Sequence, residues 1–267
     1  MYFSHLLPDE EMREIIRKTG MGVESIEFSV GENLDRFSAT MKNYQKRLEY
    51  MECESLLLHG PFLDLNPMAY DSGIRRVTMY RYEQAYEAAQ ILGAEKIVFH
   101  SCFLPNVYLT IGWADRVAEF YMEFLKDKDD SIEVLMENVL DPDPVPLKDA
   151  AEKISHRAFG LCLDLGHANC YSRLSLSQWI ETLVPWIHHV HLHDNGGERD
   201  SHSALGTGNI PLDQMLSRLE QRGDEKTYTI EYSTREEVET SWEYCQHRGE
   251  GGFCLTRNRK ISMMYRK

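Results

Sequence analysis

Side chains that commonly bind divalent metals are concentrated between residues 187 and 210, in the sequence IHHVHLHDNGGERDSHSALGTGNI. His191 lies near the end of an apolar run, and Asp200 and His202 follow in a glycine-rich loop. Imidazole nitrogens and carboxylate oxygens are the usual protein ligands of zinc and similar metals. This stretch therefore predicts a divalent-metal site beside the end of a β-strand.

Several other apolar runs, each typical of a buried strand, also end in a side chain that can bind metal. Together with the run above, their terminal residues are His59, His100, Glu137, Asp164, His191 and Glu231. Residues 137, 164 and 191 are 27 positions apart at each step, about one strand–helix unit. A charged group at the end of an apolar strand is costly to bury unless it is paired or coordinated. The repetition favours one shared cavity over coincidence.

Strand-like and helix-like segments alternate along the chain, a pattern typical of a parallel sheet with helices outside it. The predicted strands cover residues 23–30, 55–62, 96–100, 132–139, 160–165, 187–193 and 227–232, with 2–5 as a candidate eighth. The predicted helices cover residues 8–19, 33–51, 72–92, 106–126, 147–155, 175–186, 211–222 and 234–246. Eight such units would close into a parallel (β/α)8 TIM barrel, an α/β fold whose active sites form at the carboxyl ends of the strands. An open doubly wound sheet is the alternative, and we expect one domain over residues 1–267.

Composition limits the kinds of partner that the protein is expected to bind. The chain has 267 residues and a formal net charge of −14, which gives it no general attraction to nucleic acid or anionic membranes. The cysteines form no CxxC pair, and the first residues lack the apolar core of a signal peptide. No charge-free window approaches transmembrane length. We therefore expect a cytoplasmic protein with no membrane partner.

The remaining histidines need a separate interpretation, because a lone histidine on an apolar strand is more often a core residue bonded to the backbone. His189 and His193 share strand parity with His191 and are candidates for partners that orient the metal ligands. His156, His188 and His247 fit no pattern and are assigned to the surface or to helix-facing positions.

At these residues the sequence resembles the xylose isomerase-like TIM-barrel superfamily, which includes sugar isomerases, epimerases and endonuclease IV. The resemblance extends over residues 20–247. The segment LCLDLGHAN is similar to the Asp-x-x-His motif of the sixth strand, and MEN at 136–138 and Glu231 also match. HVHLHD followed by DSHSALGTGNI resembles the endonuclease IV pattern of a strand histidine, a loop Asp-x-His and a glycine-rich close.

The resemblance implies two nested sets of metal ligands. The isomerase site would hold one metal on Glu137, Asp164, His191 and Glu231. The endonuclease IV branch would add His59, His100, His167, Asp200 and His202, for up to three zinc ions, with manganese or magnesium as alternatives. One metal would then bind His59, His100 and Glu137, the second would bind the isomerase set with Glu137 bridging, and the third would bind His167, Asp200 and His202.

The chain departs from endonuclease IV in the regions that would contact DNA. The loop after the second predicted strand, GENLDRF at 31–37, is acidic, and Phe62 replaces a DNA-contacting tyrosine of that family. The net charge also opposes binding to a phosphate backbone, which depends on several lysine or arginine contacts. DNA is therefore a less favoured substrate than a small phosphoester or a sugar.

Two enzymatic hypotheses follow from the resemblance. In the first, the protein is a divalent-metal-dependent phosphoester hydrolase in which a hydroxide bridging two metals near Glu137 attacks phosphorus. In the second, it is a sugar or sugar-phosphate isomerase or epimerase, in which Glu137 and Glu231 exchange protons as acid and base around one metal. The loop residues Asp200 and His202 favour the hydrolase, because a one-metal isomerase does not require them. A metal-binding barrel without activity is a third, less favoured interpretation.

Overall fold

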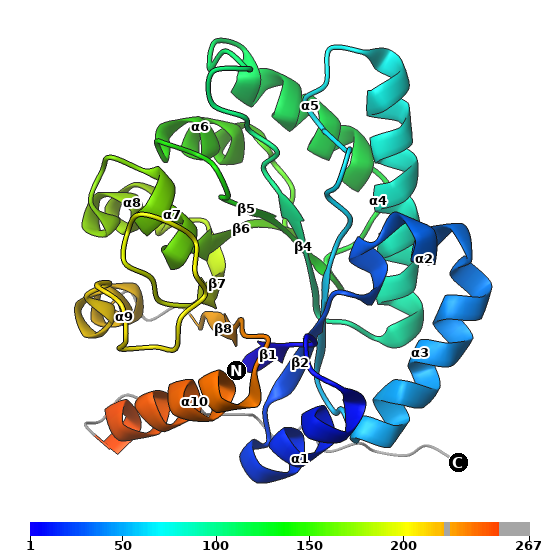
Figure 1. Cartoon of the computed structure of the whole chain (residues 1–267). Coiled ribbons are helices and arrows are strands. Elements are labelled where there is room, and N and C mark those ends of the chain that lie inside the picture. The colour runs from blue at the N-terminus through cyan, green and yellow to red at the C-terminus, as the bar shows by residue number, and fades with distance from the viewer. Residues whose placement is uncertain (222–224, 251–267) are drawn as a thin grey trace.

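The computed structural model describes residues 1–221 and 225–250, and eight parallel strands close into a barrel in chain order (Figure 1). The strands are β1 (Tyr2–Ser4), β2 (Gly22–Ser25), β3 (Leu56–His59), β4 (Lys96–His100), β5 (Glu133–Glu137), β6 (Phe159–Asp164), β7 (Ile187–Leu192) and β8 (Thr227–Ile230). β1 pairs with both β2 and β8, which closes the barrel. The predicted TIM barrel is confirmed, including the eighth strand at the start of the chain.

Helices surround the barrel between successive strands (Figure 1). They are α1 (Asp9–Thr19), η1 (Glu27–Ser29), α2 (Gly31–Asp35), α3 (Phe37–Met51), α4 (Ser72–Leu92), α5 (Trp113–Leu125), α6 (Val145–Lys153), α7 (Leu165–Tyr171), α8 (Leu176–Leu183), α9 (Leu212–Glu220) and α10 (Arg235–Glu250). Across residues 1–221 and 225–250, no helix is both long enough and apolar enough to cross a membrane.

Several predicted element boundaries differ from the structure. The strand predicted over 23–30 ends at Ser25, where the chain turns into the single 3-10 turn η1. The helix predicted over 106–126 begins only at Trp113, because Gly112 adopts a left-handed φ of 73° that a helix cannot continue through. The helix predicted over 33–51 divides at Arg36 into α2 and α3, and α7 was not predicted.

The barrel interior has an apolar layer directly beneath the strand ends. Val98, Leu135 and Cys162 form this layer, and each is at most 1% exposed. They stand two residues before His100, Glu137 and Asp164, on the same face of their strands. These three apolar side chains thus separate His100, Glu137 and Asp164 from the amino ends of their strands.

The buried carboxyl group of Asp141 lies in the loop after β5. Because of it, we expect the stability of the fold to depend on pH. Burial raises the pKa of Asp141 from 3.8 to about 6, although the Ser101 hydroxyl donates to it at 2.6 Å. The folded state therefore binds the proton more tightly than the unfolded state, and this stabilisation is lost as pH rises from about 4 to 6.

We therefore expect Asp141→Asn to stabilise the fold at pH 8 by about 1–3 kcal/mol more than at pH 4.5. The amide oxygen can still accept hydrogen bonds from Ser101 and from the Val139 N–H. Urea unfolding at the two pH values measures the difference. An equal change in free energy at both values would contradict the assignment.

Candidate metal centre

The side chains predicted from the strand ends meet at the carboxyl end of the barrel. His59, His100, Glu137 and Asp164 are the last residues of β3 to β6, His191 is the penultimate residue of β7, and Glu231 directly follows β8. His167, which lies in α7, and the loop residues Asp200 and His202 lie over the same end. The structure therefore brings all nine predicted residues together, while their binding of metal stays a prediction.

The first group of donors joins β3, β4 and β5. The Nε2 atoms of His59 and His100 lie 3.2 Å apart, and both face Glu137 Oε2, at 3.5 and 3.6 Å respectively. Phe62 stacks on the His100 ring with centroids 4.2 Å apart. Burial lowers the pKa of His100 to about 3, which keeps this imidazole neutral and its lone pair available to a metal.

The second group surrounds His191 Nδ1. This atom lies 3.2 Å from Glu137 Oε1, 3.4 Å from Glu231 Oε1 and 3.9 Å from Asp164 Oδ2. Three carboxylates from three strands thus face one imidazole nitrogen. Burial alone would raise the pKa of Glu137, but the imidazoles around it, His191 first, hold that pKa well below its usual value.

The third group involves the loop after β7. Asp200 Oδ2 lies 3.3 Å from His167 Nε2 and 3.2 Å from His202 Nε2. His193, which we expected to orient other ligands, stacks on His202 with ring centroids 3.8 Å apart. Its Nε2 atom lies 3.1 Å from Asp164 Oδ1, and its Nδ1 atom lies 3.5 Å from Asp200 Oδ1. His193 therefore connects the second group to the third.

Three of the candidate ligands have one ring nitrogen fixed by a backbone carbonyl. The Nδ1 atoms of His59, His167 and His202 lie 3.0–3.1 Å from the carbonyl oxygens of Gly60, Asn138 and Glu231. A carbonyl oxygen can only accept, so each Nδ1 carries a hydrogen and Nε2 is the ring nitrogen left to face the site. This is how protein histidines are commonly prepared for metal binding.

Buried atoms without a hydrogen-bond partner show that the residues fit a metal. Within the described residues, Glu137 Oε2, His193 Nδ1 and Asp200 Oδ1 are buried and have no such partner. Two of them are carboxylate oxygens, and burying such charges without compensation is strongly unfavourable. Divalent cations of the zinc class would compensate this set of nitrogen and oxygen donors.

The glycine-rich loop that carries Asp200 and His202 is shaped by a carboxylate, Asp194. The Asp194 side chain is fully buried and accepts backbone N–H bonds of 2.9–3.2 Å from Asn195, Gly206, Gly208 and Ile210. A side chain at Gly208 would collide with Asp194 itself and with the Asn195 backbone. These glycines thus let the loop close around Asp194, which fixes its path over the metal centre.

Replacing Asp194 by alanine should therefore destabilise the fold by about 3–5 kcal/mol, because four backbone donors lose their acceptor. Asp194→Asn keeps one oxygen and should cost about 1–2 kcal/mol. Chemical unfolding of both variants gives the comparison. A loss below about 1 kcal/mol for the alanine variant would show that the loop does not depend on Asp194.

One buried residue of the site, Glu24, was not predicted from the sequence. It lies near the end of β2, and its Oε1 atom is 3.1 Å from His191 Nε2. It was missed because the strand was expected to continue to residue 30, which placed Glu24 in the middle of the strand. With the strand ending at Ser25, Glu24 joins the series of polar strand ends.

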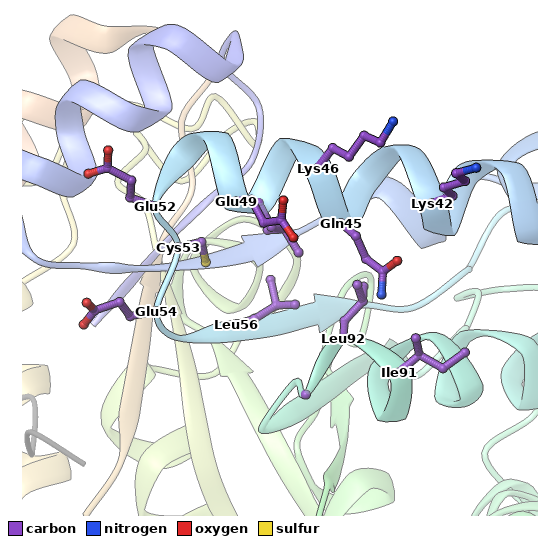
Figure 2. A pocket seen from close by; sticks show the side chains of 12 residues that line it. Lys42, Gln45, Lys46, Glu49, Glu52, Cys53, Glu54, Leu56, Ile91 and Leu92 are labelled. Atoms are coloured by element: carbon purple, nitrogen blue, oxygen red, sulfur yellow. The ribbon is translucent and has the colours of Figure 1, made fainter. Parts of the chain in front are cut away.

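A hollow of about 570 Å³ lies at the other end of the barrel and is separate from the metal centre. Figure 2 shows it between α3 and the end of α4, beside Leu56, the first residue of β3. The described side chains that line it include Lys42, Glu49 and Glu52 but no histidine. It lacks the converging donors that chemistry at the opposite end would use.

Comparison with known proteins agrees with the fold. Residues 15–246 match the family model of the xylose isomerase-like TIM barrel, and the chain belongs to this family. The family includes enzymes that act on sugars or on DNA. A sequence relative is the uncharacterized protein MJ1311 of Methanocaldococcus jannaschii, 29% identical over 191 residues, which are 66% of this chain and 64% of that protein. The chain thus spans slightly less than two thirds of the curated relatives it matches.

Two solved structures illustrate the range of activities found on this fold. A D-tagatose 3-epimerase-like protein superimposes with a TM-score of 0.76 and 23% identity, covering 93% of this chain and 96% of that one. Endonuclease IV from Thermus thermophilus superimposes with a TM-score of 0.66 and 17% identity, covering 94% and 98%. At these identities the likeness establishes the fold alone.

Proposed function

We propose that the protein is a divalent-metal-dependent phosphoester hydrolase with up to three zinc-class ions. The observation that supports this most is the position of Asp200 and His202. Asp200 Oδ2 lies 3.3 Å from His167 Nε2 and 3.2 Å from His202 Nε2, so the loop adds a third group of donors beyond the isomerase set. A reaction at a single metal does not need that group.

Glu137 is the central residue of the proposed mechanism. Its two carboxylate oxygens face different groups, Oε2 toward His59 and His100 and Oε1 toward His167 and His191. Bound divalent metals would supply Lewis-acid stabilisation of developing charge and activation of a water nucleophile. Glu137 would hold two of these ions, and Glu231 would accept and return the protons that the reaction moves.

The residues around the site favour a small phosphoester over duplex DNA. The segment 31–37, expected to be an acidic loop, folds mostly as the short helix α2 and carries Glu32 and Asp35. With a net charge of −14, the chain has little to neutralise a row of phosphates, whereas a single phosphate can be neutralised by the metals. A DNA substrate is therefore the less favoured form of this proposal.

A sugar isomerase or epimerase is the second candidate, and one geometric feature favours it. Glu137 and Glu231 approach His191 Nδ1 from different strands, at 3.2 and 3.4 Å. Two carboxylates beside one metal can exchange protons with the two faces of a carbon atom next to a carbonyl. The D-tagatose 3-epimerase-like structure has the same fold and is named for that chemistry.

Parallel assays of the zinc-loaded protein distinguish these candidates. We expect hydrolysis of bis(p-nitrophenyl) phosphate that is abolished by a chelator and restored by zinc or manganese. An abasic oligonucleotide duplex tests the DNA alternative in the same buffers. Solvent deuterium entering ketohexoses, with no phosphoester hydrolysis, would overturn the hydrolase proposal in favour of the epimerase.

A further inference from the structure

Glu24 is an ionised side chain buried inside the barrel, and a buried charge is costly unless its contacts compensate it. It is 1% exposed. Its carboxylate lies 3.1 and 3.2 Å from His191 Nε2, and its Oε2 atom accepts the Thr229 hydroxyl hydrogen at 2.5 Å. His189 Nε2 approaches the same oxygen at 3.3 Å. Four side-chain contacts from β7 and β8 therefore hold this one carboxylate, which sits on β2.

His191 is oriented differently from the other candidate ligands. His59, His167 and His202 bond to backbone carbonyls through Nδ1 and present Nε2 to the site. His191 presents Nδ1 to the site, and its Nε2 faces a carboxylate instead of a carbonyl. An anionic acceptor holds the imidazole hydrogen more strongly than a neutral carbonyl and makes the opposite nitrogen a better electron donor.

We propose that Glu24 is a positioning residue for the central metal. It accepts the Nε2–H of His191, selects that tautomer, and thereby directs the Nδ1 lone pair toward Glu137, Asp164 and Glu231. Thr229 and His189 hold Glu24 in place from β8 and β7. The inference rests on the metal at His191 that both candidate functions require, and not on which reaction follows.

Direct coordination by Glu24 is the competing interpretation, since Glu24, His191 and Glu231 offer donor atoms within 4.8 Å of one another. Two observations favour positioning. Both Glu24 oxygens already face imidazole or hydroxyl hydrogens, and Glu24 lies at the nitrogen of His191 opposite the one that faces the other carboxylates. A metal on Nε2 would have to displace these hydrogen bonds.

The test compares Glu24→Gln with the wild-type protein in a zinc competition assay against a chromophoric chelator. We expect the zinc affinity of the central site at His191 to fall by about 10- to 100-fold, with zinc still bound. Thr229→Val removes the hydroxyl that bonds Glu24 and His189 and should give a smaller loss. It replaces the glutamine variant as the test if that variant folds poorly. The control is Glu133→Gln at the opposite end of the barrel, which removes the charge of a carboxylate that lies 2.9 Å from Lys96 Nζ and 3.1 Å from His188 Nδ1. This control should leave zinc affinity unchanged.

A spectroscopic measurement separates positioning from coordination. With ¹¹³Cd in place of zinc and ¹⁵N-labelled histidine, we expect metal coupling to Nδ1 of His191 and a retained Nε2–H proton. Coupling to Nε2, or loss of one bound ion in Glu24→Gln, would overturn the proposal in favour of Glu24 as a ligand. Unchanged affinity in Glu24→Gln would overturn it outright. Absence of metal from the wild-type protein would instead refute the proposed function.

Discussion

Replacing Glu137 by glutamine should reduce activity by about 10³-fold or more and lower the metal content of the protein. Glu137 faces His59, His100, His167 and His191 together, at distances of 3.2–3.6 Å. Glutamine has nearly the same shape but lacks the charge and one of the acceptor oxygens. The buried imidazoles around it would then lose their shared counter-charge.

The two measurements for Glu137→Gln are the rate with the best substrate and zinc content by elemental analysis. Glu133→Gln is the matched control, because Glu133 and Glu137 are the first and last residues of the same strand, β5. The control should keep its metal and its rate within a few-fold. Normal metal content and a rate near wild type for Glu137→Gln would refute a metal-dependent reaction at this site.

The second large effect concerns the loop after β7. The double replacement Asp200→Ala with His202→Ala should remove one ion per chain and lower phosphoester hydrolysis by about 100-fold or more. Asp200 is the link in this group, since His167 and His202 both approach its Oδ2 atom. The first and second groups have their own donors and should keep their ions.

Ser201→Ala is the control for this loop, because Ser201 lies between the two altered residues and its side chain bonds only to Ser203 among the described contacts. It should behave as wild type. If the double variant instead retains every ion and loses only a few-fold in rate, the third group is not a metal site. The epimerase would then be the better hypothesis.

The strand ends could be predicted because each one combines a buried apolar strand with a terminal polar side chain. The steps from Glu137 to Asp164 to His191 follow from the regular size of a strand–helix unit in a parallel barrel. The fold and the convergence of these residues on one end therefore follow from local pattern and topology alone.

Other features depend on contacts that spacing does not encode. Ile26, Phe28 and Val30 continue the alternation of β2, yet Phe28 is buried in the core beside Tyr44 instead of in the sheet. The strand was therefore predicted to continue past Ser25, and Glu24 was not recognised as a residue near the strand end. Similarly, Leu109 and Ile111 fall in the helix predicted over 106–126 but are 71% and 84% exposed in the segment before α5.

Residue types alone indicated Asp200 and His202 as metal donors beside a strand end, and the family resemblance assigned them to a third metal with His167. Asp200 and His202 stand well beyond the end of β7, and nothing in their spacing from His191 directs them back over the barrel. The four backbone bonds to Asp194 do so, together with the antiparallel bridge between Asp194 and Ser203. Such a path is a property of the folded loop.

Anomalous scattering at the zinc edge, from crystals of protein purified without chelator and supplied with zinc, tests the central claim most directly. We expect three peaks, each within bonding distance of its donors. The first lies at His59, His100 and Glu137, the second at Glu137, Asp164, His191 and Glu231, and the third at His167, Asp200 and His202. A single peak at His191 with Asp200 and His202 turned to solvent, or no peak at all, would contradict it.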